Sequence, residues 1–236
     1  MFRLLQKIFR WLLNLVFPIR CLGCGKFDIW ICDECLARVK LAQVECPGCR
    51  RSMPTNQACI DCLSQISLDR LIVWADYQNP LIQKAIHALK YGFVAGLSTL
   101  LGRALAQQIM VYASPLPGSI VLVPVPLHWQ RRNERGFNQA TLLARAGAKV
   151  LNVPCWPHAI RRTKYTAPQA TLSRQDRLSN LTGLFALDRG LDFSGKIVII
   201  IDDVATTGAT LQECAKVLKS AGAAEVWGAV LARSHN

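Results

Sequence analysis

Residues 197–201, which are all β-branched (IVIII), limit what this chain can fold into more than any other stretch. Such a run is typical of a strand buried on both faces, as in a parallel sheet covered by helices. Asp202 and Asp203 follow directly, at the carboxyl end of the strand, where open α/β sheets bind their ligands. We therefore predict an α/β fold with a parallel sheet and helices on both faces, and a ligand site after this strand.

A turn of small and hydroxyl-bearing residues, 205–209, follows the two acids and precedes a helix expected to begin near Thr210. Backbone N–H groups in such a turn and at a helix N-terminus have no partner, and the helix dipole adds positive charge, so the segment can bind a phosphate. The two carboxylates would repel a phosphate, so we expect them to accept hydrogen bonds from sugar hydroxyls or to help position a metal-bound ligand. This pattern favours a ribose 5-phosphate over a plain solvated turn. The expected phosphate-binding residues are Ala205, Thr206, Thr207, Gly208, Ala209 and Thr210.

Eight of the ten cysteines form four CxxC pairs before residue 63: Cys21/Cys24, Cys32/Cys35, Cys46/Cys49 and Cys59/Cys62. Two intervening residues let one tight turn present two thiolates to a tetrahedral zinc, so we expect two structural zinc sites. We favour sequential pairing, with the first two pairs on one zinc and the last two on another, over interleaved pairing. Iron–sulfur ligation suits these spacings less well. Regular CxxC pairs beside a cysteine-poor domain also favour a reducing cytoplasm over a secreted disulfide scaffold.

The chain is strongly basic, with 28 Lys and Arg residues against 15 Asp and Glu residues and a formal net charge of +13. This balance favours anionic partners, and diphosphates, nucleic acids and acidic lipids all remain possible. Arg131, Arg132 and Arg135 are expected in a loop that follows a strand at 119–126. Guanidinium groups at the carboxyl end of a strand suit a diphosphate, because each can bond two oxygens at once. A solvated basic loop is the alternative.

A second basic stretch, residues 161–177, mixes cationic, polar and small residues, a composition typical of a mobile segment. We interpret it as a lid, since closing over a site excludes water from a reactive intermediate. The same residues could instead follow a nucleic-acid backbone, with Tyr165 stacking on a base. The candidate lid or nucleic-acid residues are Arg161, Arg162, Lys164, Gln169 and Arg174.

The first residues of the chain, 2–17, are largely apolar, with basic and polar side chains at helical spacing. We predict an amphipathic helix over residues 1–18 that packs on the protein or on a partner, or lies at the interface of an anionic membrane. A signal peptide is not favoured, because Arg10 interrupts the apolar run and no small-residue cleavage site follows. Nothing in the sequence is long enough to span a membrane.

Alternating strand and helix patterns fill the rest of the chain, which at 236 residues has room for one large domain or two smaller ones. Besides the strand at 197–201, strands are expected at 71–77, 119–126, 158–162, 184–187 and 225–232. Helices are expected at 80–90, at 97–112, from Gly136 onward and at 211–221.

Taken in order, these motifs identify a resemblance. The four CxxC pairs, RGFNQ at 135–139, Thr166 with Gln169, Arg177 with Asn180, and the acid pair with its phosphate loop resemble the ComF/GntX family of bacterial competence-associated, phosphoribosyltransferase-like proteins. The resemblance implies a type I phosphoribosyltransferase fold at 70–236 behind a double zinc ribbon at 19–64. It also implies a role in natural transformation, in which incoming single-stranded DNA is handled on the cytoplasmic side of the membrane, with competence-machinery proteins as possible partners.

Two functional hypotheses follow from this resemblance. In the first, the chain is a transferase that binds 5-phosphoribosyl 1-diphosphate (PRPP) with Mg²⁺. Asp202 and Asp203 would then bond the ribose 2- and 3-hydroxyls, and the three arginines would hold the diphosphate while a nitrogen nucleophile attacks C1. In the second, the chain is a non-catalytic module that binds single-stranded DNA and keeps the phosphate loop for binding or sensing.

Overall fold

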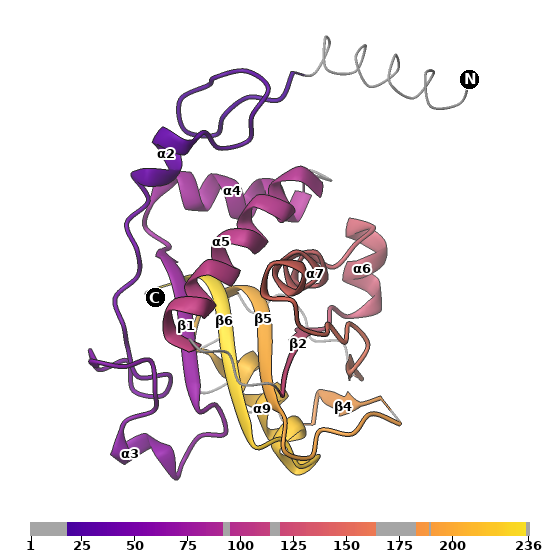
Figure 1. The fold of residues 1–236 in the computed structure, drawn as a ribbon. Helices are drawn as coiled ribbons and strands as arrows, with labels where there is room; N and C mark the ends of the chain where they lie inside the picture. Colours follow the sequence, from indigo (N-terminus) through magenta and orange to yellow (C-terminus); the bar gives the residue numbers. More distant parts are fainter. Residues whose placement is uncertain (1–17, 92–94, 114–118, 164–182, 189, 235–236) are drawn as a thin grey trace.

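The computed structural model describes residues 18–91, 95–113, 119–163, 183–188 and 190–234, and in them a parallel sheet forms the centre of the fold. Its strands lie side by side in the order β1 (Arg70–Asp76), β6 (Glu225–Arg233), β5 (Ile197–Ala205) and β2 (Ile120–Pro124) (Figure 1). The two middle strands, β5 and β6, are the longest and carry the most continuous apolar runs. The predicted parallel α/β sheet is confirmed.

Helices cover both faces of this sheet. The β-branched run of β5 projects alternate side chains to opposite sides, so each face presents an apolar surface on which helices pack. Ile199 and Ile201 belong to one apolar core, shared with α4 (Pro80–Tyr91), α5 (Ala95–Ala113) and α7 (Gln139–Leu151). Val198 and Ile200 belong to a second core, shared with α9 (Ala209–Ser220). A small antiparallel sheet of β3 (Ile160–Arg162) and β4 (Phe185–Leu187) also packs on the α9 side.

Three predicted boundaries are wrong, and each lies near the expected ligand site. Strand β5 does not end at Ile201 but continues through both acids to Ala205, because its ladder with β6 continues that far. The three arginines expected in a loop lie in a short helix, α6 (Trp129–Arg135). The next helix, α7, begins at Gln139 with Asn138 as its N-cap, and Gly136 lies in the turn before it with φ 75°.

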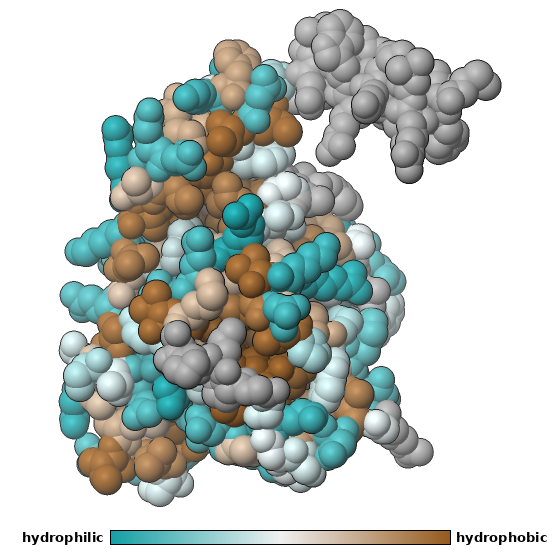
Figure 2. Space-filling view, in the orientation of Figure 1, coloured by the Kyte–Doolittle hydropathy of each residue, from teal (hydrophilic) through white to brown (hydrophobic). Residues whose placement is uncertain are grey.

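The cysteine-rich segment runs beside the sheet and contains two short helices, α2 (Asp33–Ala37) and α3 (Ile60–Leu63) (Figure 1). Between them, Leu41 makes an antiparallel bridge to Ala75, so the segment lies against the edge of β1. Cys21, Cys32 and Cys35 are buried in the same apolar core as α4. Figure 2 shows hydrophobic surface at the lower left over α3, where Ile60 is 85% exposed and Leu63 57% exposed.

Candidate functional site

The buried carboxylate of Asp203 is the centre of the candidate site. The residue is only 5% exposed, and its Oδ2 lies 3.4 Å from the Lys90 ammonium and 3.2 Å from Gln139 Nε2, which donates to it. Lys90 comes from the end of α4 and Gln139 from the start of α7, so three elements converge at the carboxyl end of β5. A cation and an amide donor compensate the burial of this charge.

The Asp202 side chain, next to Asp203 in the chain, lies in a different environment. It is half-buried, and its Oδ1 accepts the backbone N–H of Asp203 at 2.8 Å. Burial and the neighbouring Asp203 carboxylate raise the pKa of Asp202 to about 8. Asp202 therefore holds a proton more readily than an ordinary carboxyl group does, whereas the Asp203 carboxylate is paired with Lys90.

Residues 206–208 form the turn between β5 and α9, directly after the acid pair. Gly208 precedes the helix with φ 80°, a left-handed conformation that favours glycine. The hydroxyl oxygen of Thr207 accepts the N–H of Ala209 at 3.3 Å. The turn thus brings together the residues predicted to bind phosphate, and the first N–H groups of α9 have no carbonyl within the helix to bond.

The basic helix α6 begins after the carboxyl end of β2, at the same edge of the sheet. Arg131, Arg132 and Arg135 all lie on it, and its sequence WQRRNER contains good helix formers and no glycine before Gly136, which explains the helix where a loop was expected. The Arg135 guanidinium lies 5.4 Å from the centre of the Tyr91 ring, next to Lys90. One of the three predicted arginines thus contacts Tyr91, the residue that follows Lys90 in the chain.

The other predicted basic residues divide into two groups. Arg161 and Arg162 lie on strand β3, where Arg161 is exposed, and not in a loop. Beside β3 there is a hollow of about 400 Å³, lined in part by Trp129, Phe137, Arg145 and Arg161. Lys164, Gln169 and Arg174 lie outside the described residues, as do Tyr165, Thr166, Arg177, Asn180 and the N-terminal segment 1–17.

The eight paired cysteines gather into two clusters, which are the sequentially paired ones. The first cluster is Cys21, Cys24, Cys32 and Cys35, and the second is Cys46, Cys49, Cys59 and Cys62; within each, all four sulfur atoms lie within 4.8 Å of one another. Sulfur pairs at 3.8, 3.6 and 3.7 Å match the separation of about 3.8 Å that a tetrahedral zinc with Zn–S bonds of about 2.3 Å requires.

The protonation chemistry of the clusters also fits zinc. Burial alone raises the pKa of Cys21 and of Cys46, but backbone N–H groups directed at the two sulfur atoms outweigh it and lower each pKa to about 6. Bonds to neighbouring sulfur atoms raise the pKa of Cys35 and of Cys62 to about 12, and zinc binding displaces such protons. Each cluster would hold its zinc with four thiolates, a closed set that leaves no position for catalysis.

Comparison with known proteins identifies the family of the chain. The phosphoribosyl transferase domain model matches residues 138–236, which include the acid pair, the turn and α9. The chain is 35% identical over 208 residues to the DNA utilization protein YhgH of Escherichia coli (strain K12), which covers 84% of this chain and 88% of that protein. It is 34% identical over 224 residues to competence protein F of Haemophilus influenzae, which covers 90% of this chain and 96% of that protein.

This chain belongs to the ComF/GntX family. Competence protein ComFC of Bacillus subtilis (strain 168) is a further relative, 29% identical over 89% of this chain and 86% of its own length. Among solved structures, a hypoxanthine phosphoribosyltransferase from Staphylococcus aureus aligns with a TM-score of 0.40 and 18% identity over 58% of this chain and 63% of that chain. That likeness is too distant to bear on function.

The structure adds site residues of this ComF/GntX chain that the sequence did not assign. Gln139 was recognised only as part of the RGFNQ motif, and its contact with Asp203 gives that motif a physical role. Lys90 was expected only as the end of the helix at 80–90, and it is an ion-pair partner of Asp203. None of the helices in the described part of the chain has the length and apolar character that crossing a bilayer requires.

Proposed function

We propose that this ComF/GntX chain binds PRPP with Mg²⁺ at the carboxyl end of β5 and transfers its phosphoribosyl group to a nitrogen nucleophile. One observation carries the proposal. A buried acid, Asp203, is held between Lys90 and Gln139 immediately before a short turn and the N-terminus of a helix. This is the arrangement that a ribose with a 5-phosphate needs, with acceptors for the hydroxyls beside donors for the phosphate.

Each part of the ligand has a candidate partner in this proposal. The backbone of residues 205–210 and the hydroxyls of Thr206, Thr207 and Thr210 bind the 5-phosphate. Asp202 and Asp203 bond the ribose hydroxyls, and Arg131, Arg132 and Arg135 are the proposed partners of the diphosphate. The C1–N bond forms as the C1–O bond breaks and diphosphate leaves with the bonding electrons. The chain contributes by positioning the reactants and by stabilising the charge of the leaving group.

The residues present fit a Mg²⁺ ion that arrives with its ligand. In the part of the chain that the structure describes, the groups of three or more close metal-ligating side chains are the two cysteine clusters, so the acid pair is not a complete cage. Mg²⁺ is commonly bound by one or two carboxylates together with substrate phosphates, which suits Asp202 and Asp203. When bound, the ion would neutralise charge on the diphosphate.

Calorimetric titration of the zinc-loaded protein with PRPP and MgCl₂ tests this proposal. We expect saturable binding in wild type and its loss in the Asp202→Asn/Asp203→Asn variant. The matched control is Asp28→Asn/Asp192→Asn, which removes two exposed carboxylates elsewhere and should bind as wild type does. Wild-type protein that is folded and contains zinc but does not bind PRPP would refute the transferase proposal.

The names of the relatives guide the proposed setting. Because two relatives are named competence proteins, we propose that this chain acts in natural transformation, together with the competence machinery. We place it in the cytoplasm, where a reducing environment keeps eight thiols available for zinc. Its proposed units are an N-terminal helix over 1–18, a double zinc ribbon over 19–64 and a phosphoribosyltransferase-like domain over 70–236, with residues 2–17 able to contact a membrane peripherally.

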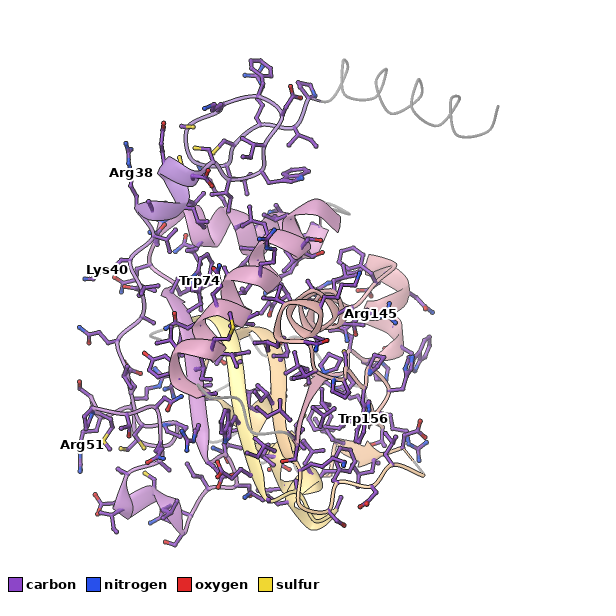
Figure 3. The ribbon with its side chains drawn as sticks, in the orientation of Figure 1. Arg38, Lys40, Arg51, Trp74, Arg145 and Trp156 are labelled. Carbon is purple, nitrogen blue, oxygen red and sulfur yellow. The ribbon has the colours of Figure 1, made fainter. Side chains whose placement is uncertain are left out.

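A second candidate function is single-stranded DNA binding, and the hollow beside β3 favours it. Trp129 is 62% exposed at the rim, and Arg145 and Arg161 are exposed next to it, so an aromatic ring for base stacking lies beside cations for phosphates. Figure 3 shows Arg145 pointing out from α7 on the α6 side. Stacking of this kind contributes about 1–3 kcal/mol per base.

Fluorescence anisotropy with a labelled oligo-dT tests this candidate. Trp129→Ala should weaken binding about tenfold or more. Arg145→Gln with Arg161→Gln should reduce the salt dependence of the binding constant, whereas Lys149→Gln, a change at an exposed lysine further along α7, should change it little. An unchanged salt dependence in the double variant would remove this surface from any DNA site.

A further inference from the structure

The second cysteine cluster directly contacts the candidate phosphate loop. Its first turn, residues 46–50, ends at Arg50, whose Nη2 donates to the backbone carbonyl oxygen of Thr206. A Cβ atom on Gly208 would lie 4.0 Å from the carbonyl oxygen of Pro47 in the same turn. Thr206 and Gly208, the first and last residues of the turn between β5 and α9, thus both lie against one turn of the second cluster.

The backbone of Arg50 is itself unusual. Its φ is 64°, the left-handed region that glycine adopts with less strain, and its N–H donates to the Cys46 carbonyl oxygen at 3.1 Å to close the turn. A glycine would serve the turn better but would provide no guanidinium. At this position a left-handed backbone therefore carries a side chain that reaches the phosphate loop.

Arg233 fixes the same turn to the sheet. This last residue of β6 is 3% exposed, and its Nη1 lies 3.2 Å from a Glu45 carboxylate oxygen and donates to the Cys46 carbonyl oxygen at 3.4 Å. Its Nη2 donates to the Pro47 carbonyl oxygen at 3.3 Å. Because Arg233 lies opposite Ala205 in the ladder, the turn of the second cluster is held at the strand ends from which the phosphate loop departs.

We propose that Arg50 is a positioning residue for the phosphate loop, through which the second cysteine cluster forms part of the site for a 5-phosphate. In a trans peptide the C=O and N–H groups point in opposite directions. By holding the Thr206 carbonyl, Arg50 turns the Thr207 N–H of the same peptide away from the cluster, toward the ligand side. A cationic donor on the carbonyl also polarises that peptide and strengthens its N–H as a donor to phosphate. The inference rests on the proposed phosphoribosyl site.

The neighbouring arginine provides a matched control. Arg51 belongs to the same cluster, but its Nη1 pairs with Asp61 at 3.2 Å in a solvent-exposed contact. Figure 3 shows the Arg51 side chain at the outer margin of the molecule, pointing away from the sheet. Replacing Arg51 removes the same charge from the same cluster without touching the phosphate loop.

Calorimetric binding of ribose 5-phosphate, and of PRPP with MgCl₂, to the full zinc-loaded chain tests the inference. We expect Arg50→Ala to weaken both ligands about 10- to 100-fold, the range for losing one charge-assisted hydrogen bond in a site. Arg50→Lys keeps a cationic donor and should recover part of that loss, and Arg51→Ala should bind as wild type does. In ¹H–¹⁵N spectra without ligand, the Thr207 amide should move in Arg50→Ala and stay in place in Arg51→Ala.

The outcomes distinguish a failure of the Arg50 role from a failure of the proposed phosphoribosyl site. If wild type binds either ligand and Arg50→Ala binds it equally well, or if the Thr207 amide does not move, the role of Arg50 is overturned and the phosphoribosyl site stands. If wild type binds neither ligand, the proposed function fails and this inference fails with it. Zinc content is measured for every variant. Should Arg50→Ala lose zinc, Arg50→Gln replaces it as the neutral variant, and wild-type affinity with an unmoved Thr207 amide in Arg50→Gln would overturn the inference.

Discussion

Replacing Asp202 with asparagine is expected to stabilise the ligand-free protein, increasingly so as the pH rises. Burial and the Asp203 carboxylate raise the pKa of Asp202 from an ordinary 3.8 to about 8. Between these two values the folded state keeps a proton that the unfolded state has released, so wild-type stability falls as the pH rises through this window. Asparagine has no charge to release, and its side-chain oxygen can still accept the Asp203 N–H.

The magnitude follows from the same pKa. Each pH unit across the window is worth about 1.4 kcal/mol of unfolding free energy, which sets an upper limit of about 5–6 kcal/mol. Because Asp202 is only half-buried and solvent screens its charge, we expect a gain of about 1–3 kcal/mol at pH 8. The gain should shrink steadily towards pH 5 and be close to zero near pH 4, where the carboxyl is protonated in both states.

Urea unfolding of wild type and Asp202→Asn at several values between pH 4 and pH 9 provides the measurement. Asp192→Asn is a control of opposite sign, because the backbone N–H of Ser194 lowers the pKa of the exposed Asp192. The stabilisation that ionised Asp192 gives the folded state is present at neutral pH and is lost as the pH falls through its folded pKa. A variant that is less stable than wild type at pH 8, or a gain that grows as the pH falls, would refute this account of Asp202.

Two further pairs of substitutions test the clusters and the helix packing. Cys24→Ser and Cys49→Ser each remove one exposed ligand, and metal analysis should find one zinc fewer in each, with only Cys49→Ser weakening ribose 5-phosphate binding in calorimetry. Gly102→Ala should cost about 1–3 kcal/mol in urea unfolding, because the new Cβ would lie 2.8 Å from the Leu143 carbonyl oxygen between α5 and α7. Gly147→Ala on the facing helix is the comparison, with its nearest contact at 3.5 Å, and should be neutral or stabilising by up to about 1 kcal/mol.

The parallel sheet was predictable because its central strand carries a strong local pattern. Five consecutive β-branched residues are rare outside a strand buried on both faces, and β5 is such a strand. Regular CxxC spacing was equally local, and it predicted two four-cysteine clusters with sequential pairing, which the sulfur positions confirm. In both cases the residues that determine the structure lie within a few positions of one another in the chain.

The end of β5 was not predictable by the same reasoning, because polarity suggested a stop that tertiary contacts overrule. Asp202 and Asp203 read as the start of a loop, yet Asp202 pairs with Val230 and the ladder continues to Ala205. Burying a carboxylate at the end of a central strand costs desolvation energy that polar partners must offset. Here the partners are Lys90 and Gln139, which belong to two other elements. No local sequence pattern predicts that Lys90 and Gln139 contact Asp203.

The contact between Arg50 and Thr206 could not be predicted from any local pattern, since the two residues are 156 positions apart. Reading the zinc clusters as purely structural was reasonable, because a closed set of four thiolates has no open position for chemistry. A closed set of thiolates excludes chemistry at the metal, but the turn at residues 46–50 can still contact other parts of the protein. Arg233, at the end of the chain's last strand, holds the turn of the second cluster against the sheet. In the role that we propose for Arg50, a structural metal site would position the phosphate loop through the Arg50 side chain, while its cation stays out of the reaction.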